Sequence, residues 1–186
     1  WDGQPVTEAP LFYQGLSQQT ADLLEGMSDD IQATKKALEA ALSIDLSLTL
    51  PVYDYQMQVY GHNIDDSSSL RTVFRTNHAF RGLTCPMDKL PDGLLVPAFG
   101  CRYLTEDLPY GLAVLKGIAE LAGVDTPHFD KVLAWAQDKI GHVYIGPDKR
   151  IVAGSPDVQR SGCPQRWGYT SMEDLRDSFH DTVTAQ

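Results

Sequence analysis

The chain has 186 residues, enough for one good hydrophobic core, and 42% of them are hydrophobic, as in an ordinary globular protein. Its 25 acidic residues outnumber the 15 basic ones, and the resulting formal net charge of −10 repels nucleic-acid phosphates and anionic membrane surfaces. No apolar run is long enough to span a bilayer. We therefore expect neither nucleic acid nor a membrane among its partners.

Helix signals dominate the first half of the chain. Ser17 is placed to cap a helix of about 25 residues, whose apolar side chains recur at helical spacing. Pro51 begins a shorter helix that is expected to end at Gly61. The stretch "SSLRTVFRTN" (68–77) predicts a third helix of about two or three turns, and the Gly- and Pro-rich segment 78–100 predicts an ordered loop.

The clearest element is a pair of helices between residues 108 and 141. Apolar residues step by four and three along one face of the first helix, and Gly123 lies where a C-terminal glycine belongs. Thr126 and Pro127 predict an N-cap followed by proline at the first position of the second helix, which Gly141 ends. Because the connection between them is short, the two helices must pack side by side as an αα-hairpin.

The segment that follows is mostly irregular. Its stretches "HVYI" and "RIV" predict a short ribbon, and Thr170 is placed to cap a last short helix, "SMEDLRDSF". No repeat, low-complexity tract or linker interrupts the chain. We therefore predict one all-α domain over residues 1–186, and a monomer, because no long exposed apolar stripe is evident.

The cysteines and histidines form no metal or disulfide pattern. Cys85, Cys101 and Cys163 are odd in number, widely separated and without a C-x-x-C spacing, which is typical of a reduced, cytoplasmic protein. His62 is the histidine nearest to neighbouring carboxylates, but its segment "GHNIDDSSS" has the composition of turns. We predict no metal site and expect Cys101 to pack rather than react.

Two charges, Arg102 and Asp107, precede the helix pair. Pro109 disfavours helical geometry at Leu108, so the helix is predicted to begin at Pro109 with Asp107 at its mouth. There the carboxylate would accept free backbone N–H groups and meet the positive end of the helix dipole, worth about 1 kcal/mol. Asp107 is thus a cap, part of a site, or both, and Arg102 is either a solvated charge or a clamp for an anionic ligand.

Four phrases resemble the C-terminal domain of the opine dehydrogenases, the family of the octopine, strombine, alanopine and tauropine enzymes. They are "WDGQPVTEAPLFYQG" (1–15), "TNHAFRGLTCP" (76–86), "FGCRYLTEDLPYGLAVLKGIAELAGVDTP" (99–127) and "CPQRWG" (163–168). The R-x-x-x-x-D-x-P-x-G block in the third phrase is the most specific. The resemblance implies the helical C-terminal domain of a two-domain reductase of the 6-phosphogluconate-dehydrogenase-like kind.

The resemblance also implies an activity. Opine dehydrogenases join the amine of an amino acid to an α-keto acid such as pyruvate and reduce the imine with NADH, regenerating NAD in anaerobic glycolysis. An N-terminal Rossmann domain, expected before Trp1 and absent from this chain, binds NAD, so no residue here is predicted to bind the cofactor. Arg102 would grip a substrate carboxylate, and Asp107 would orient a catalytic histidine that is also expected before Trp1.

The chemistry suits these two side chains. A planar guanidinium binds a carboxylate with two parallel hydrogen bonds, and histidine is the proton shuttle for neutral pH, with a carboxylate to fix its tautomer. Tyr13 and Gln14 either line the substrate cleft or pack the entry loop. His78 and Arg81, in "NHAFRG", either touch substrate or cofactor or wedge their loop in place.

Two other functions fit the same helices. A reductase of the glycerol-3-phosphate dehydrogenase or ketopantoate reductase type also has a helical second half, but such enzymes rely on a catalytic lysine. Lys116 here lies in mid-helix with no obvious site. A helical interaction module would instead leave Arg102 and Asp107 as a surface pair. For the opine dehydrogenase interpretation, the isolated chain is predicted to be inactive.

Overall fold

The computed structural model describes the backbone of residues 3–184 and the side chains of residues 3–178. Trp1 and Asp2, which begin the first of the four phrases, lie outside the described residues. The chain forms two compact units, each made of two segments. The first unit comprises the residues up to Gly26 and Leu50–Cys101, and the second comprises Met27–Thr49 and the residues from Arg102 onward. Helix α1 (Gln18–Leu42) contributes to both units.

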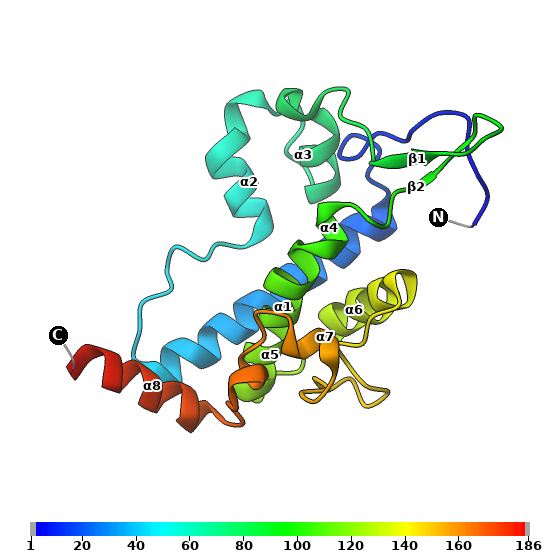
Figure 1. Ribbon diagram of the computed structural model, residues 1–186. Helices are drawn as coiled ribbons and strands as arrows, with labels where there is room; N and C mark the ends of the chain where they lie inside the picture. Colours follow the sequence, from blue (N-terminus) through cyan, green and yellow to red (C-terminus); the bar gives the residue numbers. More distant parts are fainter. Residues whose placement is uncertain (1–2, 185–186) are drawn as a thin grey trace. The chain divides into compact units, whose positions relative to one another are not determined.

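The first unit is built around stacked aromatic rings. Helices α2 (Val52–Tyr60) and α3 (Leu70–Thr76) lie next to each other (Figure 1). Tyr13 stacks on Phe80 with 4.3 Å between ring centroids, and Phe80 stacks on Phe74 at 5.7 Å. Offset stacking of this kind adds about 0.5–1.5 kcal/mol per pair to the burial of the rings themselves. The rings thus fix the entry loop and the segment after α3 in one cluster.

The three predicted helices of the first half are confirmed. The hydroxyl of Ser17 accepts the N–H of Thr20 at 3.1 Å at the start of α1, and Pro51 stands at the N-cap of α2. The hydroxyls of Ser69 and Thr72 form a capping box at the start of α3. Gly61 ends α2 as predicted, although the chain continues there in the 3₁₀ turn η1 (Gly61–Asn63).

The prediction of a loop over residues 78–100 is partly wrong. The segment contains the 3₁₀ turn η2 (His78–Phe80) and an antiparallel hairpin of β1 (Met87–Lys89) and β2 (Leu95–Pro97). Leu95 also exchanges backbone hydrogen bonds of 2.8 and 2.9 Å with Val6. The local hairpin is thus joined by a pairing with the distant N-terminal segment, which the local composition does not reveal.

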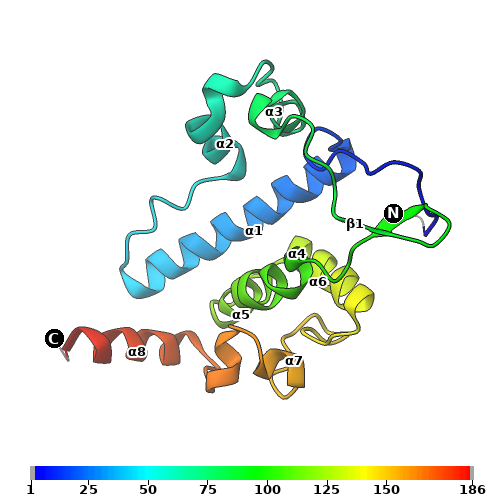
Figure 2. The ribbon, with the colours of Figure 1, turned by 45° about the horizontal axis from the view of Figure 1, so that its top comes forward.

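The second unit contains the predicted helix pair. Helix α4 (Arg102–Thr105), the π-helical turn η3 (Leu108–Leu112) and α5 (Ala113–Leu121) follow one another in one rod, and α6 (Pro127–Ile140) lies beside α5 (Figure 2). The αα-hairpin is confirmed. Its core consists of the buried residues Leu108, Ala113, Leu133, Ala136, Tyr144, Ile145, Ile151, Val158 and Cys163.

The N-terminus of α6 is capped by a carboxylate from α1. Oδ2 of the buried Asp30 accepts the backbone N–H groups of His128 and Phe129, each at 3.0 Å. Thr126 holds the N-cap position, as predicted, but its side chain makes no capping bond and instead accepts a hydrogen bond from Lys116. The cap is therefore supplied from far along the chain rather than by the neighbouring residue.

The C-terminal segment wraps around this core. The predicted ribbon is present only as a single bridge between Ile145 and Ile151. Short helical turns follow at α7 (Pro156–Gln159) and η4 (Pro164–Trp167), ahead of helix α8 (Met172–Thr184).

The expected cap of the last helix is displaced by one residue. The hydroxyl of Ser171, rather than that of Thr170, accepts the N–H of Asp174 at 3.2 Å. The carboxylate of Asp174 in turn accepts the N–H groups of Thr170 and Ser171, and these bonds, chiefly those from Thr170, lower its pKa. Because Thr170 also contacts this carboxylate through its hydroxyl, both residues stabilise the helix start.

Candidate functional site

Asp107 makes no capping hydrogen bond, so the capping alternative is wrong, and so is the predicted helix start at Pro109. Helical geometry begins at Arg102, and Asp107 itself has right-handed helical angles of φ −68° and ψ −24°. Its side chain accepts no capping hydrogen bond. The helix therefore runs through the position that was expected to be its mouth.

A wide π turn explains why the proline does not start the helix. The N–H of Ala113 bonds to the carbonyl of Leu108, five residues back, whereas an α-helix would pair it with Pro109, four residues back. Pro109 has no N–H to lose, and the N–H of Tyr110 still reaches the carbonyl of Glu106 at 3.0 Å. The extra residue in the turn accommodates the proline ring inside a continuous rod.

The Asp107 carboxylate is exposed on this rod. It lies in a shallow hollow with Glu106, Tyr110 and Gly111. Helical spacing brings Tyr103, four residues earlier, and Tyr110, three residues later, to the same side of the helix as Asp107. Within the described side chains, the carboxylate has no hydrogen-bond or ion-pair partner. It is held on a rigid element and is available to a group from outside.

Arg102 is similarly accessible. Its side chain is 70% exposed, and its guanidinium lies 3.5 Å from the carboxylate of Glu106, one helical turn later. An exposed pair of this kind contributes about 0–1 kcal/mol. A carboxylate ligand could therefore displace Glu106 from Arg102 at little cost and form two parallel hydrogen bonds in its place.

Tyr13 and Gln14 lie in the first unit and hold the entry loop. Tyr13 is half-buried in the ring cluster with Phe80. The Gln14 amide donates to the carbonyl of Arg75 at 3.3 Å and accepts the N–H of Gly82 at 3.1 Å. These contacts are those of packing and loop fixation, and contact with a substrate stays a prediction for both residues.

His78 and Arg81 are exposed residues of the first unit. Nε2 of His78 lies 2.7 Å from Oδ2 of Asp65, a pairing that sequence spacing did not indicate. The Asp65 carboxylate thus contacts one ring nitrogen of the imidazole, while Arg81 lies at the end of the turn η2. A role for either residue at the substrate also stays a prediction.

Lys116 is committed to the fold. It is 5% exposed, and its Nζ lies 2.6 Å from Oδ1 of Asp130 and 3.1 Å from the hydroxyl of Thr126. Removing one partner from a buried ion pair typically costs about 3–5 kcal/mol, because the other charge is left uncompensated. The lysine that a rival class of reductase would need is therefore a link between α5 and α6 rather than a free catalytic group.

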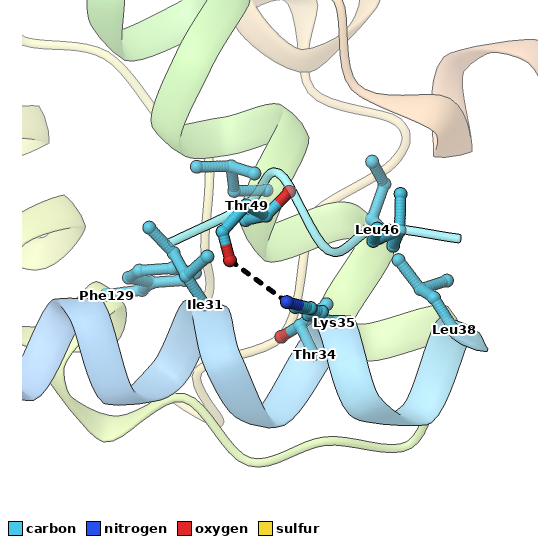
Figure 3. Close-up of a pocket in the computed structure, with 9 residues that line it drawn as sticks. Ile31, Thr34, Lys35, Leu38, Leu46, Thr49 and Phe129 are labelled. Carbon is cyan, nitrogen blue, oxygen red and sulfur yellow. Dashed lines mark hydrogen bonds between the residues drawn. The ribbon is translucent and has the colours of Figure 1, made fainter. Parts of the chain in front are cut away.

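An apolar cavity lies in the second unit (Figure 3), and its lining shares no residue with the hollow at Asp107. Its volume is about 120 Å³, and it is lined by Ile31, Thr34, Lys35, Leu38, Leu46, Thr49, Leu115, Ile118 and Phe129. Figure 3 shows the Lys35 ammonium turned to the carbonyl of Thr49, to which it donates at 3.1 Å. Lys35 is the one charged residue among those that line the cavity, and this bond holds its ammonium against the backbone of Thr49.

Two further features concern metal binding and membrane insertion. In the part of the chain that the structure describes, no group of three or more His, Cys, Asp or Glu side chains is arranged to hold a metal ion. None of the helices between residues 3 and 184 combines the length and the apolar character that a membrane crossing requires.

The geometry defines an all-α domain whose π-bulged helix presents an arginine and an aspartate that has no partner among the described side chains. Residues 4–140 match the family described as NAD/NADP octopine/nopaline dehydrogenase, alpha-helical domain. This chain belongs to that family. The resemblance drawn from the four phrases is confirmed, and so is the all-α fold class.

Individual relatives agree with the family match. The opine dehydrogenase of Haliotis discus hannai is 44% identical over 180 residues, which are 94% of this chain and 43% of that protein. The structure of octopine dehydrogenase with NADH and L-arginine matches with a TM-score of 0.87 at 41% identity, covering 94% of this chain and 43% of that one. The structure with NADH and pyruvate gives a TM-score of 0.80 at 39% identity, covering 94% and 41%. The chain therefore spans less than half the length of these relatives.

Proposed function

We propose that this chain is the substrate-binding domain of an NAD-dependent opine dehydrogenase. The enzyme condenses the amine of an amino acid with an α-keto acid such as pyruvate and reduces the imine with NADH. One observation carries the proposal beyond family membership: an exposed Asp107 carboxylate, without a partner in the part of the chain that the structure describes, lies five residues from an exposed Arg102 on one rigid helix. Solved relatives bind NADH together with L-arginine or pyruvate.

Arg102 and Asp107 have separate roles in this proposal. Arg102 exchanges Glu106 for a substrate carboxylate, which a guanidinium grips with two hydrogen bonds. Asp107 accepts the ring N–H of a catalytic histidine expected in the preceding domain, fixes its tautomer and stabilises its charged form. The histidine then moves the protons of carbonyl addition and imine formation.

The family resemblance also assigns substrate contacts to four residues of the first unit. Tyr13 and Gln14 shape the loop that follows the N-terminal segment, and His78 and Arg81 flank the turn η2. When Nε2 of His78 donates to Asp65, Nδ1 of the neutral ring can accept a hydrogen bond from a substrate hydroxyl, and the protonated ring can donate one to a substrate carboxylate. These assignments rest on the family resemblance of both segments.

The cofactor belongs to another part of the proposed enzyme. This sequence has no Gly-x-Gly-x-x-Gly turn and no other loop suited to a pyrophosphate, so its residues do not fit an NAD site. We place NAD in an N-terminal Rossmann domain and the helical domain over residues 1–186. Three free cysteines support a reducing, cytoplasmic location, and scattered exposed apolar side chains support a monomer.

A substrate panel tests the proposal. The full-length enzyme is given NADH and pyruvate with each of a series of amino acids, and the loss of NADH absorbance is followed. We expect turnover only when both a keto acid and an amine are present. Amine-independent turnover of dihydroxyacetone phosphate or ketopantoate would instead support the rival reductases, and no turnover with any pair would support an interaction module.

A further inference from the structure

The π turn beside Asp107 leaves one backbone carbonyl without its usual helical hydrogen bond, and a residue elsewhere in the chain supplies the donor. Because the N–H of Ala113 bonds to Leu108, the carbonyl of Pro109 loses the partner that a regular helix would provide. Pro109 is buried, so water does not readily replace that partner. The N–H of Gly162 donates to this carbonyl at 3.0 Å.

A second bond joins the same two segments. The hydroxyl of Tyr110 donates to the carbonyl of Arg160 at 3.0 Å. The consecutive residues Pro109 and Tyr110 are thus tied to residues 162 and 160 by separate hydrogen bonds. Tyr110 also lines the hollow in which Asp107 lies, so the contact reaches the edge of the proposed site.

The close approach of the two segments requires a glycine at position 162. A Cβ atom on this residue would lie 2.9 Å from Cγ2 of Val114 and 3.5 Å from Cδ1 of Tyr110. Valine has little rotamer freedom in a helix and does not easily move aside. A side chain at position 162 would therefore push the segment away from the π turn and lengthen the bond to Pro109.

The segment 160–163 is itself anchored, through the phrase "CPQRWG" that follows it. The Gln165 amide donates to the carbonyl of Gly117 at 2.9 Å, and the Arg166 guanidinium donates to that of Ser161 at 2.7 Å. Cys163 is fully buried and lies 2.8 Å from Oε1 of Gln165. This phrase lies outside the family match over residues 4–140, and its contacts attach the segment to α5.

We propose that Gly162 and Tyr110 are positioning residues, which hold the π turn in shape and thereby aim the Asp107 carboxylate. The inference rests on the proposed function, in which Asp107 orients the catalytic histidine. A carboxylate displaced by a fraction of an ångström no longer fixes the imidazole in its productive direction. Loosening the segment should then slow proton transfer while leaving substrate and cofactor contacts in place.

A double-mutant cycle on the full-length enzyme tests the inference. We expect Asp107→Asn to lower kcat by roughly 10²–10⁴-fold and Gly162→Ala to lower it by about 10-fold. The double variant should be no slower than Asp107→Asn within about twofold, because Gly162 acts through Asp107. Gly154→Ala is the matched control, since position 154 has open space and no left-handed backbone, and it should match the wild type.

The pH profile provides a readout that a purely structural role would not move. The kcat profile of Gly162→Ala should shift in the same direction as that of Asp107→Asn, because both weaken the charge that stabilises the imidazolium. The KM values for NADH and for the keto acid should stay within about twofold of the wild type, since no substrate contact is removed.

Tyr110→Phe is a second test that introduces no steric clash, for use whether or not Gly162→Ala folds. We expect a several-fold loss of kcat that is likewise absent in the Asp107→Asn background. A silent Tyr110→Phe, a full multiplication of its effect with that of Asp107→Asn, or an effect on the keto-acid KM alone would overturn the inference. A silent Asp107→Asn would instead contradict the proposed function itself.

Discussion

At the scale of single residues, the structure gives Asp107 no role in capping the helix. It lies within a helix, accepts no backbone N–H and has no partner among the described side chains. An exposed charge kept on a rigid element without a structural contact is what a site for an external group requires. Because Asp107 makes no capping bond, the effect of a substitution on catalysis can be measured separately from its effect on stability.

Asp107→Asn should therefore leave the stability of the full-length enzyme unchanged. Because the carboxylate makes no capping bond, we expect the free energy of unfolding to change by less than about 0.5 kcal/mol, so the thermal midpoint should hardly move. The kcat should fall as described above. The check is thermal unfolding and turnover measured on the same preparation. A lowered midpoint with normal turnover would return Asp107 to a structural role.

Arg102→Ala should weaken binding of the keto acid. We expect kcat/KM for the keto acid to fall by a factor that corresponds to a loss of about 2 to 4 kcal/mol of transition-state stabilisation. The KM for the keto acid should rise, while NADH affinity changes far less. Glu106→Ala is the matched control, because it frees Arg102 from its exposed pair without removing the guanidinium. Steady-state kinetics decide the matter: an unchanged keto-acid KM with lost NADH binding would make Arg102 a cofactor ligand.

At the scale of elements, local signals predicted helices well and their ends less well. Periodic apolar side chains and neighbouring caps placed α1, α2, α3 and α6 within a residue or two, since both signals lie within the helix itself. The helix that contains Asp107 begins earlier than predicted. The residue before a proline disfavours helical geometry, and the prediction took this preference as a strict helix boundary. The carbonyl of Pro109, which loses its helical partner at the π turn, accepts the N–H of Gly162, a partner far along the chain.

The cap of α6 gives the same lesson and a prediction. Asp30→Ala removes a buried carboxylate that accepts two backbone N–H groups, so we expect unfolding stability to fall by about 1–2 kcal/mol. Asp29→Ala is the control at the adjacent exposed position and should change stability by less than about 0.5 kcal/mol. Urea unfolding of both variants provides the measurement. Equal effects of the two substitutions would contradict the capping role.

At the scale of the whole molecule, the family was accessible from the sequence while the site geometry was not. Four phrases spread over the chain were enough to indicate the opine dehydrogenases, and the family match confirms them. The hollow at Asp107 is lined by residues 106–111, but the segment 160–163 reaches this helix through contacts between residues about 50 positions apart. Distant backbone partners of this kind have no signature in local composition.

The last prediction concerns the division of labour within the proposed enzyme. The chain lacks a phosphate-binding turn, and the proposed general base belongs to the preceding domain, so the isolated domain should neither bind NADH measurably nor oxidise it. The domain is purified alone, its fold is checked by circular dichroism, and NADH is titrated calorimetrically with and without pyruvate and amino acid. The full-length enzyme under the same conditions is the positive control. NADH-dependent turnover by a folded isolated domain would show that the cofactor site and the base both lie within these residues, and the two-domain proposal would then be wrong.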